Sequence, residues 1–231
     1  MEKILEKFND FPSIKLRHVF TNCLLDHDYL INDFRCNQFV HKYIRPQDEI
    51  IVNHPKLIKH LKLCYPNIPL IYSTTLNIMD IDTINEITKN NIYVLNYNKN
   101  NDNNYINQLQ HKENIEILCG ELCVDNCPNR AQHYLLTSQK ILDAQLDSSQ
   151  LKEIDCPMIM NEPPTHLKDI LNYKHSITNE RIEELSNMGI QYFKIAGRSI
   201  PLVLWLDILL YYLALPEYHD ELKQMFLLNW W

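Results

Sequence analysis

Short apolar runs rich in β-branched and aromatic residues alternate along the chain with longer segments in which apolar residues recur every three or four positions. The runs predict β-strands at residues 16–22, 49–53, 70–73, 92–95, 115–119, 158–160 and 192–196, and an eighth strand near Ile177 is an alternative. Parallel strands need long crossover connections, so strands that alternate with helical segments are typical of α/β folds with a parallel sheet.

Helix start signals support the same order of elements. Pro55 is placed to open a helix after the second strand, and capping-type side chains begin the segments 80–90 and 179–188. Residues 200–215 form the most apolar stretch, but Asp207 interrupts it and it is shorter than the ~20 residues that cross a bilayer. We therefore expect a buried helix there and no membrane span. Residues 98–104 are predicted to be a polar loop.

These elements predict a single (β/α) TIM-type barrel over residues 1–231. The chain is slightly shorter than the usual ~250 residues of that fold, so the barrel is expected to be somewhat reduced or irregular. In such a barrel the functional side chains lie at the carboxyl ends of the strands. The side chains at those ends here are Asn22, Cys23, Asn53, His54, Ser73, Thr74, Asn96, residues 119–127 and residues 194–198.

Glycine is scarce, with 3 residues (Gly120, Gly189 and Gly197) in 231. These positions cannot supply a G-x-G-x-x-G fingerprint or a phosphate-binding loop, which excludes the usual backbone cradles for dinucleotides and nucleoside triphosphates. The 22 basic and 29 acidic residues give a net charge of −7, which disfavours a phosphate backbone as a partner. Nucleic-acid binding is therefore not expected from the charge.

The cysteines are the most informative residues. The start of the chain, MEKILEKFNDF, is charged and lacks the continuous apolar core of a secretion signal, so we expect a cytoplasmic protein. Its 7 cysteines then need an explanation other than disulfides. Four of them lie close in sequence, at Cys119, Cys123, Cys127 and Cys156.

A loop between a strand and a helix can turn several thiolates toward one point, as a soft iron or zinc centre requires. Cys119 is the last residue of an apolar strand, which is more typical of a buried core cysteine. Cys123, Cys127 and Cys156 are instead predicted to bind metal.

The run IEILCGELCVDNCPNRAQHY (residues 115–134), the later Cys156-Pro157 and the segment FKIAGR (residues 193–198) resemble the collagenase-like peptidase family. That family includes the UbiU and UbiV proteins and the YrrN- and YhbU-type proteins. The resemblance continues more loosely from Phe20 to the end of the predicted barrel. It implies a TIM-type barrel, a 4Fe-4S cluster on four cysteines, and oxygen-independent hydroxylation of RNA bases or quinone precursors.

Carried over residue by residue, Cys123, Cys127 and Cys156 match the cluster ligands of this family. The fourth ligand has no obvious counterpart, and either Cys119 or Cys23, at the end of the first predicted strand, could complete the set. Zinc is the alternative metal.

Other candidate site residues are cationic. Lys194 and Arg198 flank Gly197 at the end of a late strand, where they could hold a carboxylate or phosphate of the substrate. The alternative for Arg198 is a structural ion pair with Glu121, with Lys194 on the outer face. Arg130 and His133 share a helix face just after the cysteine loop, so Arg130 is a candidate cofactor-binding residue and His133 a candidate proton donor.

The sequence therefore predicts an iron-sulfur protein that carries out, or assists as an accessory subunit, an oxygen-independent modification of a small molecule, peptide or RNA. A peptidase of the same family is an alternative, although no hydrolase motif supports it. A second alternative is a non-catalytic partner subunit with structural zinc. Its apolar C-terminal helix and the tail at residues 226–231 would then dock on another subunit, as a homo- or hetero-oligomer.

Overall fold

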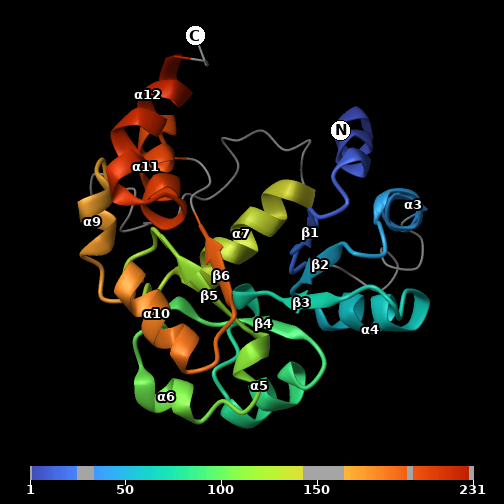
Figure 1. Cartoon of the computed structure of the whole chain (residues 1–231). Coiled ribbons are helices and arrows are strands. Elements are labelled where there is room, and N and C mark those ends of the chain that lie inside the picture. Colours follow the sequence, from blue (N-terminus) through green and yellow to red (C-terminus); the bar gives the residue numbers. More distant parts are fainter. Residues whose placement is uncertain (1, 25–33, 143–163, 197–199, 229–231) are drawn as a thin grey trace. The chain divides into compact units, whose positions relative to one another are not determined.

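The computed structural model describes residues 2–24, 34–142, 164–196 and 200–228 (Figure 1). Its strands form a parallel sheet in the order β1-β2-β3-β4-β5-β6. The strands are β1 (Arg17–Phe20), β2 (Glu49–Val52), β3 (Leu70–Tyr72), β4 (Ile92–Val94), β5 (Ile115–Cys119) and β6 (Tyr192–Ile195). The prediction of a mixed α/β fold with a parallel sheet is confirmed.

The predicted closed barrel is not present among the described residues, because β1 and β6 stand at the two ends of the strand order. The strand predicted at residues 158–160 lies outside the described residues. The alternative strand near Ile177 is wrong: Ile177 is fully buried, but it lies in a connection between two helices. A single apolar residue between polar neighbours can fill a place in the core without being part of a strand.

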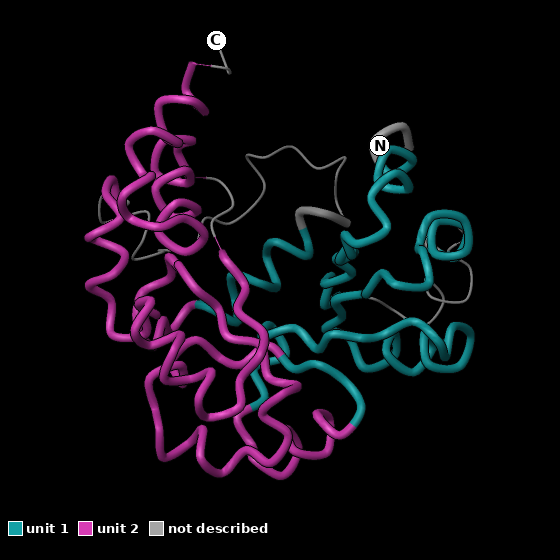
Figure 2. The backbone as a smooth tube through the Cα atoms, viewed as in Figure 1, with its two compact units in different colours: residues 1–78, 90–93, 130–154 teal, residues 79–89, 94–129, 155–231 magenta. Residues whose placement is uncertain are grey.

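The chain divides into two compact units, shown in Figure 2. The first unit comprises residues 1–78, 90–93 and 130–154, and the second comprises residues 79–89, 94–129 and 155–231. The helices of the first unit are α1 (Glu2–Lys7), α3 (Phe34–Tyr43), α4 (Pro55–Cys64) and α7 (Arg130–Leu142). Those of the second are α5 (Ile81–Thr88), α6 (Asn103–Asn107), α9 (Leu167–Leu171), α10 (Asn179–Asn187), α11 (Leu202–Leu213) and α12 (His219–Leu228).

The strands of the sheet interior are short, continuous apolar runs. Every residue of β2, β3, β4 and β5 is buried, as is usual for strands covered on both faces. The predicted helix starts are also confirmed. Pro55 is the first residue of α4, and Asp80 accepts a hydrogen bond from the Thr83 backbone N–H at 2.8 Å. Helix α10 begins at Asn179 as predicted, but its capping side chain is that of Thr178, one residue earlier.

The apolar segment at residues 200–215 contains α11, but only one side of that helix is buried. Leu204 and Ile208 pack with Ile170 of α9 in an apolar cluster, whereas Leu213 is 73% exposed. The expectation of a buried helix is therefore wrong for half of its surface, because the helix is apolar all round and packs along a single face. Among the described helices, none is both long and apolar enough to span a membrane.

In the first unit, a buried carboxylate holds the segment before β1 against the start of β2. Asp48 accepts hydrogen bonds from the Leu16 backbone N–H at 2.9 Å and from the Arg45 side chain, with Nη2 at 2.8 Å. The same guanidinium donates to the backbone carbonyls of Phe8 and Ile14. Burial opposes the ionisation of Asp48, but these hydrogen bonds outweigh it and lower its pKa to about 2.

We predict that Asp48→Asn removes about 2 kcal/mol of stability at pH 6, because one pKa unit corresponds to about 1.4 kcal/mol. The folded pKa lies below the unfolded value near 3.9, so this contribution is complete above about pH 5 and is lost as the pH falls toward 2. Urea unfolding of both proteins at pH 6 and pH 3 measures the difference. The difference in unfolding free energy between wild type and Asp48→Asn should be smaller at pH 3 than at pH 6. The control Glu183→Gln, at an exposed site, should be as stable as wild type at both pH values. An equal difference at pH 6 and pH 3 would contradict the lowered pKa of Asp48.

Candidate functional site

The loop after β5 carries two of the predicted metal ligands. The strand ends at the buried Cys119, and the chain then turns at Gly120, whose φ of 72° lies in the left-handed region that favours glycine. The residues that follow, 121–129, are here named the cysteine loop. They contain Cys123 and Cys127, both of which are half-buried.

Residues that follow β4 hold the outer part of the cysteine loop. The Tyr97 hydroxyl donates to the Val124 carbonyl at 2.8 Å, and the Asn126 backbone N–H donates to Asn98 Oδ1 at 2.9 Å. Asn126 has a φ of 51°, a conformation that asparagine tolerates better than most residues. Inside the loop, the Cys123 backbone N–H donates to Glu121 Oε1 at 3.1 Å. Hydrogen bonds at the Cys123 N–H and at the neighbouring Val124 carbonyl therefore fix the backbone around Cys123.

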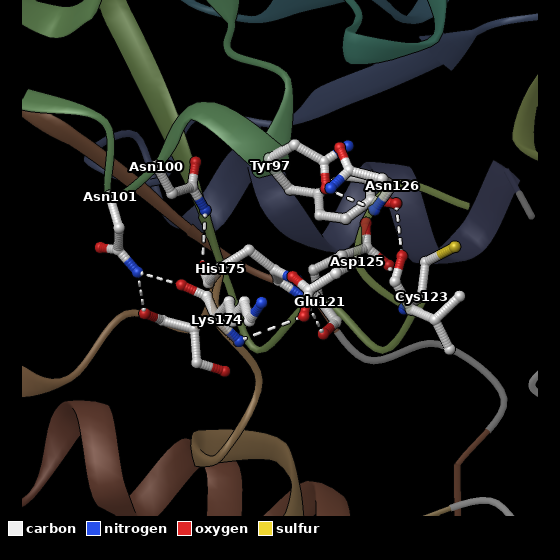
Figure 3. A network of polar contacts seen from close by, with 12 residues as sticks. Tyr97, Asn100, Asn101, Glu121, Cys123, Asp125, Asn126, Lys174 and His175 are labelled. Carbon is white, nitrogen blue, oxygen red and sulfur yellow. Dashed lines mark hydrogen bonds and ion pairs between the residues drawn. The ribbon is translucent and has the colours of Figure 1, made fainter. Parts of the chain in front are cut away.

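His175 holds the inner part of the cysteine loop (Figure 3). Its side chain is 1% exposed, with Nδ1 at 2.7 Å from Asp125 Oδ1 and Nε2 at 3.2 Å from the Glu121 carbonyl oxygen. Both partners of the ring are hydrogen-bond acceptors, and the Lys174 backbone N–H also donates to Asp125, at 3.4 Å from Oδ2. The two contacts together fix the orientation of the imidazole.

Two aromatic rings enclose His175. Tyr97 makes an edge contact with the imidazole at a centroid distance of 4.6 Å, and Tyr173 stacks on it at 5.4 Å. Burial, then the charges of Asp169, Asp125 and Cys123, raise the pKa of the Tyr173 hydroxyl. Tyr173 therefore stays neutral at physiological pH, and Cys123 lies close enough to influence it.

Two asparagines join the remaining segments of this network. Asn100 is fully buried and donates from Nδ2 to the Leu118 carbonyl at 3.0 Å and to the His175 carbonyl at 3.2 Å. Asn101 Nδ2 donates to the carbonyls of Lys174 and Ser176. The carboxyl ends of β4 and β5 and the segment 173–176 thus form one polar network within the second unit (Figure 3).

The cysteines separate into different environments. Cys119 is 1% exposed, and burial followed by the charge of Glu116 raises the pKa of its thiol to about 12. It belongs to the core and is neutral, as expected for the last residue of an apolar strand. Within the described residues, no group of three or more His, Cys, Asp or Glu side chains is arranged to hold a metal ion. Cys156 lies outside the described residues.

Three further candidates belong to the first unit. Cys23 Sγ lies 3.1 Å from the Ser138 hydroxyl, and the Cys23 backbone N–H donates to the same oxygen, so this cysteine anchors the end of β1 to α7. Arg130 lies over the Tyr134 ring at 5.1 Å, and His133 is exposed on α7.

Lys194 and Arg198 were predicted to hold an anion. Lys194 lies on β6, and its neighbour Ile195 packs against the Ile170–Ile208 cluster on the other face of the strand. Because successive residues of a strand point to opposite faces, Lys194 lies on the face opposite the cluster that Ile195 contacts. Arg198 lies outside the described residues, so its predicted roles stay predictions.

Sequence reasoning missed Asn100 and His175, and it included Asp125 only as part of residues 119–127 at the strand ends, without a role of its own. Asn100 was assigned to a plain polar loop at residues 98–104, and that assignment is wrong for this buried residue. His175 is 50 positions from Asp125 and 75 from Asn100 along the chain, so no local spacing marks the contact. The only available signal was that the residues 98–104 follow a predicted strand, at the barrel end where functional groups are expected.

The network limits the chemistry available at the cysteine loop. A catalytic cysteine needs a histidine nitrogen that is able to accept its proton. Both ring nitrogens of His175 are already engaged with Asp125 and Glu121, so this histidine fixes the loop and is not placed as a general base for Cys123.

Comparisons of the chain with protein-family models, with curated proteins and with solved structures found no match. The resemblance to the collagenase-like peptidase family therefore stays a prediction.

The different cysteine environments predict different rates of alkylation. At pH 8 a thiol with a pKa of about 12 is ionised on the order of one part in ten thousand, so native Cys119 should not react with iodoacetamide over an hour. The exposed Cys64 should react within minutes, and Cys123 and Cys127 at intermediate rates. Mass spectrometry of digests measures the extent at each site. Rapid labelling of Cys119 in the folded protein would show that it is not a core residue.

We predict that His175→Phe keeps the ring contact with Tyr97 but loosens the cysteine loop, because Asp125 and the Glu121 carbonyl lose their contacts with the ring nitrogens. The expected cost is about 1–3 kcal/mol, and amide hydrogen exchange should accelerate across residues 121–127. Exchange in α5, which does not contact the ring, is the internal reference, and His111→Phe is the matched control at a more exposed histidine. Unchanged protection of residues 121–127 would contradict the proposed role of His175.

Proposed function

We propose that this chain binds a thiolate-ligated metal centre at the cysteine loop, with a 4Fe-4S cluster favoured and zinc as the alternative. The observation that carries the proposal is that Cys123 and Cys127 are both half-buried on one loop whose backbone is fixed by Tyr97, Asn98 and His175. A metal site is favoured where the ligands are already held in position and the thiols remain reachable. The cysteine loop meets both conditions.

The described residues fit such a centre in part. Cys119 does not fit, since its thiol is buried in the core and held neutral. The proposed ligands are therefore Cys123, Cys127 and Cys156, with Cys23 or a non-cysteine group as the fourth. A bound cluster would supply single-electron transfer, and the ionised thiolates of the loop would be its ligands.

Around this centre we assign the roles implied by the family resemblance. Lys194 and Arg198 hold an anionic group of the substrate, Arg130 lies next to the cofactor, and His133 donates a proton. The fold is taken as a reduced TIM-type barrel, for which the parallel order of β1 to β6 is the support. The resulting function is an oxygen-independent modification in the cytosol, performed by this chain or by an enzyme that it assists.

A second candidate is a non-catalytic partner subunit with structural zinc at the same cysteines. The observation that favours it is the exposed apolar surface of α11 and α12, which a monomeric protein seldom displays. The peptidase alternative has less support, because the histidine nearest Cys123 in the network has no nitrogen available for catalysis.

We predict that Cys123→Ser, Cys127→Ser and Cys156→Ser each reduce the metal content of anaerobically purified protein by at least about tenfold. Cys64→Ser, an exposed position on α4, is the matched control and should keep wild-type metal content. Iron, sulfide and zinc analysis with an absorption spectrum distinguishes a brown iron-sulfur protein from a colourless zinc protein.

Cys119→Ser and Cys23→Ser complete the series and test the fourth ligand. We expect Cys119→Ser to retain metal and to lose stability instead, because it replaces a buried thiol in the core. Equal metal content in the Cys64, Cys123, Cys127 and Cys156 variants would overturn the metal proposal.

A further inference from the structure

An apolar groove runs between α11 and α12 in the second unit. It encloses about 260 Å³ and is lined from α11 by Trp205, Leu209 and Leu213, among others, and from α12 by Leu222 and Phe226. Its walls carry almost no polar atoms. The groove is remote in sequence from the cysteine loop, and no step of the metal proposal uses it.

The apolar side chains along the groove remain exposed in the folded chain. Leu213 is 73% exposed, Phe226 49% and Trp205 40%. Leu215 in the connection between the two helices and Met225 and Leu228 on α12 are also exposed apolar residues. Large apolar patches of this kind mark interaction sites, because their exposure to water is costly and monomeric proteins seldom keep them.

Charge is distributed unevenly around the groove. The turn that joins the two helices and the first turn of α12 contain three exposed acids, Glu217, Asp220 and Glu221. The cation of this hairpin, Lys223, is paired with Asp207. The connection between the two helices, next to Leu213 and Leu222 in the sequence, is therefore acidic, and the residues that line the groove itself are apolar.

We propose that this groove binds an amphipathic helix of a partner protein, with the apolar face of that helix against Trp205, Leu213 and Phe226. Lysine or arginine residues at one end of the partner helix lie beside Glu217, Asp220 and Glu221. An apolar groove between two helices is a common receptor for such a helix, since each partner buries the surface that the other exposes. The acidic turn then determines the direction in which the helix lies.

Charge also decides against two other occupants. A second copy of the chain would bring the same acidic hairpin, and a net charge of −7, to the interface. An anionic membrane surface attracts lysine and arginine, whereas the exposed charges of the acidic connection are carboxylates. A basic partner helix complements both the apolar walls and the acidic connection.

The test uses the full chain and two fluorescent helical peptides of about 18 residues, long enough to fold against the groove. Both peptides carry leucine at positions three and four apart; one has lysines at one end and the other has glutamates at the same positions. Anisotropy titration measures binding. We expect the lysine peptide to bind at least about tenfold more tightly than the glutamate peptide, and this preference should shrink as salt is raised.

Two sets of variants locate the binding. Leu213→Asp should weaken binding of the lysine peptide by at least about tenfold, whereas Leu63→Asp, at a leucine of similar exposure on α4, should not. The triple variant Glu217→Gln, Asp220→Asn, Glu221→Gln should lose the preference for the lysine peptide. A charge-matched control at three exposed acids elsewhere should keep that preference: Asp10→Asn, Asp82→Asn and Glu183→Gln.

Circular dichroism of every variant verifies that the chain is folded, and the exposed positions chosen make this the expected result. Absence of binding by both peptides, or equal binding of the two, would overturn the proposal. A chain that is dimeric by light scattering, that Leu213→Asp makes monomeric and that binds neither peptide would identify the occupant as a second copy instead.

Discussion

The second unit depends on the burial of one imidazole between a carboxylate and a backbone carbonyl. His175 is inaccessible to water, and its two nitrogens engage Asp125 and the Glu121 carbonyl. Burying a polar ring without hydrogen bonds costs free energy of folding. The contacts with Asp125 and Glu121 therefore fix the position of the ring, and the ring in turn fixes these two residues. Through His175 the cysteine loop is joined to the segment 173–176, and through Asn100 that segment is joined to the ends of β4 and β5.

In the first unit, a buried carboxylate holds connecting segments together in a similar way. Asp48 is fully buried and accepts from Leu16 and Arg45, and the Arg45 guanidinium also satisfies the carbonyls of Phe8 and Ile14. Backbone groups in a connection have no hydrogen-bond partners from a helix or sheet, and here the Asp48–Arg45 pair provides such partners. In both units, hydrogen bonds to a carboxylate hold a connection in place, by way of Asp48 in the first unit and Asp125 in the second, and apolar strands supply the core.

The same chain leaves its most apolar helix half uncovered. Packing of α11 against α9 accounts for the burial of Leu204 and Ile208, but it leaves Trp205 and Leu213 in contact with water. A side chain of this size contributes about 1.5–3 kcal/mol when it is buried, so the uncovered face represents binding energy that the folded chain has not used. The cysteine loop and this hairpin are therefore separate candidate sites, one for a metal and one for a protein helix.

The sequence by itself determined the local elements. Continuous apolar runs specified β2 to β5, Pro55 and Asp80 specified helix starts, and Gly120 specified a turn after β5, because each of these depends on neighbouring residues alone. The position of Cys119 at the end of an apolar strand also predicted its burial. The parallel direction of the strands followed from the alternation of strands and helices.

Only the tertiary structure decided which polar residues meet. Asn100, Asp125 and His175 come from three separate connections, and none of them belongs to a residue type that typically forms the core. Likewise, the apolar pattern of residues 200–215 predicts a helix but not which of its faces is covered, since that depends on how many neighbours pack against it. Local patterns encode backbone geometry and hydrophobic periodicity, whereas hydrogen bonds between distant segments are selected when the chain packs, and no local spacing records them.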